Sequence, residues 1–140
     1  MFDPAPQVVS VPTVVNPIAD LLRRAKALIA DEAKWTTYVL RDSKGRMCVR
    51  GALIEAAFHP RWEATHYLVA GFKPANEDWG AGFPNGAAFI MAEEKLGAAA
   101  VEGTVHPPAI RYAIMLNNTM GHAATMRMID RAIELAESAA

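Results

Sequence analysis

Cysteine is nearly absent from this sequence: Cys48 is the only one among 140 residues, which excludes an internal disulfide and fits a reducing compartment. Long apolar runs are missing too, because no stretch reaches the roughly 18 uninterrupted apolar residues that a membrane-spanning helix needs. The N-terminus lacks the positive charges of a secretory signal and has Asp3 and Pro4 instead. We therefore expect a cytoplasmic protein without a membrane partner.

A strong charge of either sign is also missing. The formal net charge is −1, so no overall field would attract nucleic acid, and we expect no nucleic-acid partner. The sequence has no zinc-ligand spacing, no phosphate-binding glycine motif and no Gly-x-Ser-x-Gly elbow. Glu63 and His66 have the i, i+3 spacing of di-iron helical bundles, but the second copy that such a site requires is absent. We therefore predict no metal site and no cofactor.

The composition is that of one globular domain, with 52% apolar and 21% charged residues. Residues 1–16 are rich in proline and valine, which favour extended backbone, so we expect an extended N-terminal arm. Valines gain free energy when they leave water, so this arm should pack on the domain or on a partner. Residues 17–140 should form a single helical domain.

Apolar spacing predicts an all-α fold of five to six helices around a single core. Asn16 is a good N-cap and Pro17 suits the first helical position, so the first helix should cover residues 17–30. The other helices are predicted at residues 47–58, 60–71, 85–100, 107–116 and 122–138. We expect the first helix to contact the last, and Trp35–Leu40 to form one or two helical turns.

Cys48 is the one candidate nucleophile. It lies near a predicted helix N-terminus and close to Arg46 and Arg50, and both features stabilise a thiolate. A small thiol-dependent hydrolase or transferase would also need a histidine base, and no spacing selects one; His122 is paired with Cys48 in this alternative. The other available histidines are His59, His66 and His106. The competing interpretation is that Cys48 is a small buried apolar residue.

The longest irregular segment, residues 72–86, is the candidate binding site. It carries two large aromatic residues, Trp79 and Phe83, beside the acidic pair Glu77 and Asp78. Exposed aromatic residues in a loop are typical of binding surfaces, although they can also anchor a loop on its own core. We expect one of the two rings to be exposed or to line a groove. Our leading interpretation is a non-enzymatic binding or regulatory module that acts through protein–protein contact or self-association.

A basic turn lies between the first two predicted helices. It is either a solvated face or a patch for an acidic partner. Its residues are Arg41, Lys44, Arg46 and Arg50.

Two separated segments resemble a known family. The first runs from Leu21 to Leu53 and contains Trp35-Thr36, Arg41-Asp-Ser-Lys-Gly45 and Cys48-x-x-Gly51-Ala52-Leu53. The second contains Asn117-Asn118, Gly121-His122 and Ile129-Asp-Arg-Ala-Ile133. Together they resemble the bacterial and phage family catalogued as domain of unknown function 6197, over the first third and the last sixth of the chain. Met47 stands where that family usually has Trp, and Asn118 where it usually has Asp.

The resemblance implies a helical fold and a microbial or phage origin, and it implies no activity. Elementary physical chemistry suggests structural roles for the shared residues. Trp35 should close one end of the core, and Gly51 and Ala52 should hold their helix against the C-terminal helix. Asn117 or Asn118 should cap helix ends, because short amides bind free backbone groups.

Overall fold

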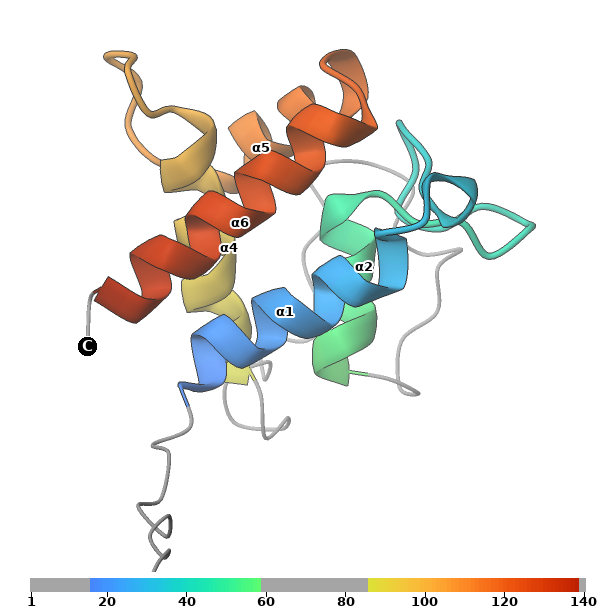
Figure 1. The fold of residues 1–140 in the computed structure, drawn as a ribbon, viewed down its shortest axis with the longest axis horizontal. Coiled ribbons are helices and arrows are strands. Elements are labelled where there is room, and N and C mark those ends of the chain that lie inside the picture. The colour runs from blue at the N-terminus through green and yellow to red at the C-terminus, as the bar shows by residue number, and fades with distance from the viewer. Residues whose placement is uncertain (1–15, 59–85, 139–140) are drawn as a thin grey trace, which may run out of the picture.

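The computed structural model of this chain describes residues 16–58 and 86–138 (Figure 1). These residues form five α-helices and one short 3-10 helix, and none of them belongs to a β-strand, so the predicted all-α fold is confirmed. The elements are α1 (Pro17–Ile29), η2 (Glu32–Lys34), α2 (Val49–Phe58), α4 (Gly86–Ala100), α5 (Ile110–Thr119) and α6 (His122–Ser138). The predictions for the N-terminal arm, for a helix at residues 60–71 and for the loop with Trp79 and Phe83 fall outside the described ranges.

Helix α1 begins as its sequence predicts. The Asn16 side chain accepts hydrogen bonds from the N–H groups of Ile18 and Ala19, and Pro17 occupies the first helical position. One stripe of the helix is buried in the core. Its members are Ala19, Leu21, Leu22, Ala25 and Ile29.

Helices α1 and α6 lie side by side across one face of the molecule, as predicted (Figure 1). At one end, Asn16 Nδ2 donates a hydrogen bond to the carbonyl of Ala136 (3.1 Å). Helix α4 packs against both of these helices and against α5, and α2 covers the other side of α1. The core is therefore built around α1 and α4: α1 contacts three of the other four α-helices, and α4 contacts all four.

Helix α2 owes its close packing to Gly51. A Cβ atom at this position would lie 1.9 Å from the Leu40 carbonyl oxygen, so only glycine allows this approach. Helix α2 faces mainly α1, with lighter contacts to α4 and α5, and the prediction that Gly51 and Ala52 hold it against the C-terminal helix is therefore wrong. The missing Cβ instead allows the backbone of Leu40, in the connection before α2, to pass close to the helix.

The predicted helical turns at Trp35–Leu40 are also wrong. The 3-10 helix η2 ends before them, and Trp35 pairs with Met47 in an isolated β-bridge. Thr36 N–H donates to the Met47 carbonyl, and Met47 N–H donates to the Lys34 carbonyl, both at 3.0 Å. The extended backbone therefore satisfies its polar groups across the loop, and β-branched residues such as Thr36 favour this conformation.

Helix α6 has the bounds predicted for it, and the other helix boundaries differ from the predictions by at most a few residues. Helix α2 begins at Val49, because Met47 lies in the bridge, and α5 begins at Ile110, because Pro107 and Pro108 continue the preceding loop. In the described ranges, no helix is both long and apolar enough to cross a membrane.

Candidate functional site

Asn117 is the polar centre of one end of the molecule. Its side chain is fully buried, and its two amide atoms take part in four hydrogen bonds. Oδ1 accepts from Trp35 Nε1 (2.8 Å) and from Val49 N–H (3.0 Å). Nδ2 donates to the Thr36 carbonyl and to Asn118 Oδ1, both at 3.2 Å. The bond to Val49 caps α2 from a residue 68 positions away, which confirms the predicted capping role.

Trp35 and His122 complete this polar centre. Their rings meet edge to face, with 5.4 Å between the centroids. His122 Nε2 lies 2.8 Å from the carbonyl oxygen of Ile29, the last residue of α1, so this nitrogen carries the donated proton. Trp35 is half-buried and packs against the core, as predicted.

Asn118 holds Tyr38 in an uncommon backbone conformation. Tyr38 N–H donates to Asn118 Oδ1 (2.8 Å), and Tyr38 has a φ of 69° in the left-handed region. It is the only non-glycine residue with a positive φ in the part of the chain that the structure describes. Its side chain is 70% exposed, so the protein keeps a strained backbone position while the ring faces solvent.

Two exposed methionines flank Asn118 in the sequence, one on α5 and one at its C-terminal end. Met115 stands one turn before Asn118 on that helix and is 56% exposed. Met120, the C-cap residue of α5, is 65% exposed. Because Asn118 binds the Tyr38 backbone and stands between the two methionines in the sequence, we group Tyr38, Met115 and Met120 and call them the Tyr38 surface. No periodicity or motif indicates these residues as a site, because each appears in the sequence as an ordinary apolar residue.

Cys48, the candidate nucleophile, is buried. Its Sγ accepts a hydrogen bond from the N–H of Gly51 (3.4 Å), so the thiol caps the first turn of α2. Burial raises the pKa of the Cys48 thiol, although backbone N–H groups and Arg50 oppose this effect. These features are those of a structural cysteine rather than of an activated nucleophile.

The histidines of the described ranges have other partners. His122 binds the Ile29 carbonyl, and His106 stacks on Tyr112 with 4.9 Å between the ring centroids. Neither hydrogen-bonds the thiol of Cys48. The candidate bases His59 and His66 lie outside the described residues, as do the candidate binding residues Glu77, Asp78, Trp79 and Phe83.

Three of the four residues of the basic turn pair with acidic residues. The ion pairs are Arg41 with Glu55 (3.3 Å), Arg46 with Asp42 (2.6 Å) and Arg50 with Glu93 (2.6 Å). Arg50 and Glu93 are nearly buried, and burial raises the pKa of Glu93 against the opposing effect of Arg50. Because these arginines have acidic partners within the chain, the turn does not form an uncompensated basic patch. Among residues 16–58 and 86–138, no group of three potential metal ligands comes together.

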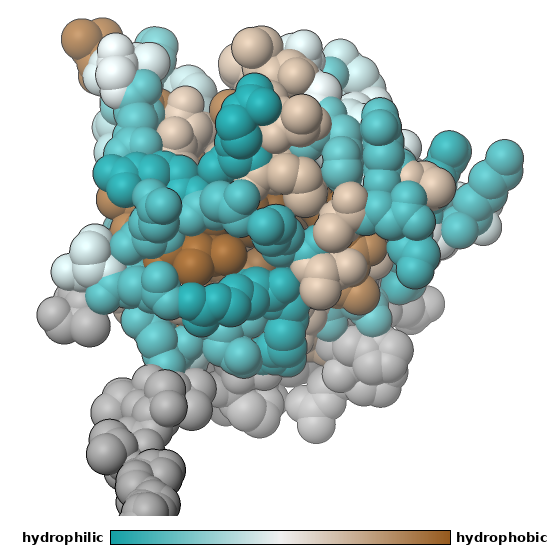
Figure 2. Space-filling model, viewed as in Figure 1, coloured by the Kyte–Doolittle hydropathy of each residue, from teal (hydrophilic) through white to brown (hydrophobic). Residues whose placement is uncertain are grey.

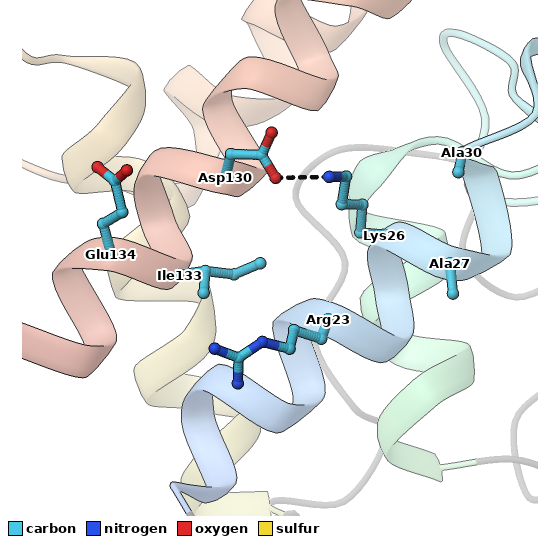
Figure 3. Close-up of a pocket in the computed structure, with 7 residues that line it drawn as sticks. All are labelled: Arg23, Lys26, Ala27, Ala30, Asp130, Ile133 and Glu134. Atoms are coloured by element: carbon cyan, nitrogen blue, oxygen red, sulfur yellow. Dashed lines mark hydrogen bonds and ion pairs between the residues drawn. The ribbon is translucent and has the colours of Figure 1, made fainter.

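A groove opens between α1 and α6 on the face shown in Figure 3. Its volume is about 670 Å³, and Ile133 lies at its floor. Lys26 reaches across it to Asp130, with 2.7 Å between Nζ and Oδ1. Figure 2 shows the groove from outside as an apolar strip between two hydrophilic walls.

The model of a family of unknown function (DUF6197) matches residues 13–135 of this chain. The chain belongs to this family. The match is wider than the two segments that carry the sequence resemblance, because it also spans the middle of the chain. No curated protein and no solved structure matches the chain.

The fold brings the two family segments together around one residue. Trp35 and the start of the Cys48-x-x-Gly51 helix come from the first segment, and both donate to Asn117 of the second. His122, also of the second segment, packs on Trp35. In this DUF6197 protein, the shared motifs therefore build the support on which the Tyr38 surface stands.

Proposed function

We propose that this protein is a non-enzymatic binding module and that it contacts a protein partner through the Tyr38 surface. The observation that carries this proposal is the backbone conformation of Tyr38. An ordinary side chain in the left-handed region costs about 1–2 kcal/mol, a cost that glycine avoids. The exposed ring of Tyr38 returns little of that cost to folding, so its position is better explained by a contact outside the chain.

The composition of the surface suggests the chemistry of the partner. Tyrosine is enriched at protein interfaces because it combines a large apolar ring with a hydroxyl group. Methionine adapts its shape to irregular surfaces, which suits Met115 and Met120 at the edge of the contact. A partner with an apolar pocket and one hydrogen-bonding group near its rim would fit this surface.

The surface is also rigidly supported, which lowers the entropic cost of binding. Asn118 fixes the backbone of Tyr38, and Asn117 fixes the side chain of Asn118. Buried Asn117 is in turn held by Trp35 and Val49. The Tyr38 ring is therefore presented by a continuous hydrogen-bonded network rather than by a loose loop.

A photo-crosslinking amino acid in place of Tyr38 would capture the partner in cells, and the purified partner would then be titrated against variants. Tyr38→Gly should raise the melting temperature, because it relieves the backbone strain, and should weaken binding about tenfold or more. Met115→Ser should weaken binding with little change in stability. Val105→Ser is the matched control, because Val105 is 98% exposed in the connection between α4 and α5.

The proposal fails if Tyr38→Gly and Met115→Ser bind the captured partner as tightly as the wild-type chain does. It also fails if Tyr38→Gly lowers stability, because the tyrosine would then be required by the fold itself.

A further inference from the structure

The groove between α1 and α6 has walls of opposite charge. Arg23 and Lys26 line the wall on α1. Asp130 and Glu134 line the wall on α6, and Glu137, which pairs with Arg23, stands one turn beyond Glu134. The floor between them is apolar at Ile133 (Figures 2 and 3). One face of the protein therefore carries a basic strip and an acidic strip that run side by side.

These charges are already paired within the chain, but only weakly. Arg23 pairs with Glu137, and Lys26 pairs with Asp130. All four side chains are between 36% and 53% exposed. Exposed ion pairs contribute little net free energy, so the same charges can exchange their partners for those of another molecule at small cost.

The pattern is complementary to itself. If a second copy is turned by a two-fold axis along the groove, its α1 wall lies over the α6 wall of the first copy at the same level. Lys26 of one copy then faces Asp130 of the other, and Arg23 faces Glu137, on both sides of the axis. A two-fold axis across the groove would instead place like charges against each other, which is unfavourable.

We propose that this groove is a self-association surface, and that a second copy of this chain docks on it with α1 over α6. The arrangement is a two-layer bundle of four helices in which each helix runs antiparallel to the helix it faces, a common packing for amphipathic helices. The charged strips set the orientation, and the pairing of Lys26 and Arg23 with the acidic wall of the second copy, together with burial of the exposed Ala27, supplies the attraction. This surface is distinct from the Tyr38 surface, so each proposal can fail without the other.

A charge-swap experiment tests this arrangement. The first variant, Arg23→Glu/Lys26→Glu, makes both walls acidic, and the second, Asp130→Lys/Glu137→Arg, makes the α6 wall net basic like the α1 wall, although Glu134 remains. By sedimentation velocity, the wild-type chain should form a dimer, and each variant alone should dimerise at least about tenfold more weakly. An equimolar mixture of the two variants should form a heterodimer, because every facing pair of walls is then opposite in charge. High salt should weaken both the wild-type dimer and the heterodimer.

Two controls separate docking from folding. The variant with all four substitutions exchanges the walls, restores the ion pairs within the chain and should dimerise like the wild type. Lys34→Glu/Lys44→Glu changes the net charge as the first variant does but lies outside the groove, and should leave the dimer intact. A wild-type chain that stays monomeric at all concentrations would overturn the proposal. A dimer that both wall variants leave unchanged would also overturn it, as would a mixture that fails to associate.

Discussion

The side chains of Asn117 and Asn118 are adjacent but have opposite tolerance for a carboxyl group. Asn117 uses both of its amide atoms, because Oδ1 accepts from two N–H donors and Nδ2 donates to two oxygens. The hydrogen bonds of Asn118 end on Oδ1, which accepts from Tyr38 N–H and from Asn117 Nδ2. Asparagine and aspartate differ only in this second atom, so the pair of variants isolates its role.

Asn117→Asp should be strongly destabilising. The new carboxylate still accepts from Trp35 Nε1 and Val49 N–H, but its second oxygen meets the Thr36 carbonyl and Asn118 Oδ1, which are acceptors too. Two lost hydrogen bonds and a buried charge together cost about 3–5 kcal/mol. For a chain of this size that corresponds to a fall in melting temperature of roughly 10–15 °C.

Asn118→Asp should be tolerated, because both observed bonds end on the retained oxygen and a charged acceptor strengthens them. We expect its free energy of unfolding to stay within about 0.5 kcal/mol of the wild-type value or to rise slightly. Thermal unfolding followed by circular dichroism measures both variants. The penalty of Asn117→Asp should shrink under mildly acidic conditions, where the protonated carboxyl can donate to Thr36.

Equal stability losses for the two variants would refute this reasoning. So would a tolerated Asn117→Asp variant, because the amide orientation inferred from the four hydrogen bonds would then be wrong.

Three further predictions concern packing and burial. Gly51→Ala should lower the free energy of unfolding by about 3 kcal/mol, because its Cβ would meet the Leu40 carbonyl, and urea unfolding would measure the loss. Cys48 is buried, and burial also raises the pKa of its thiol, so we expect it to react with an alkylating reagent only as fast as the protein opens. Rapid labelling of the native protein would contradict this. Glu93→Leu alone should cost about 3 kcal/mol, whereas Arg50→Met/Glu93→Leu should be nearly neutral, because only the single change leaves a buried charge without this partner. Burial raises the pKa of Glu93, so between its unfolded and folded pKa values the native state keeps a proton that the unfolded chain has released. The free energy of unfolding that this group contributes therefore falls as the pH rises through that range. The double variant, which lacks Glu93, should not show this fall.

Helices with local signals were predictable from the sequence. Asn16 and Pro17 specify the start of α1, and the apolar stripe of that helix specifies the face it buries. The regular spacing of apolar residues in α6 had the same effect, and the contact between these two helices follows from their buried stripes. Capping and periodicity depend on neighbours a few positions apart, so a single sequence contains them.

The connection between α1 and α2 was not predictable in the same way. Trp35 has an apolar neighbourhood that suits a short helix, but Met47 supplies an extended partner twelve residues later. A glycine at position 51, inside a predicted helix, indicates that another backbone segment packs close to that helix, but the sequence does not identify that segment. Leu40 takes that place because the loop folds back over the first turn of α2.

By itself, the sequence determined the all-α class, the caps and buried faces of the regular helices, and a resemblance to the DUF6197 family that the family match over residues 13–135 confirms. Only the tertiary structure decided that Asn117 joins Trp35 to the start of α2, that Asn118 strains the backbone of Tyr38, and that opposite charges line the groove between α1 and α6. The physical reason is range: caps and amphipathic stripes are short-range patterns within one helix. A hydrogen bond across 80 residues, or a wall facing another wall, exists only after the helices have packed.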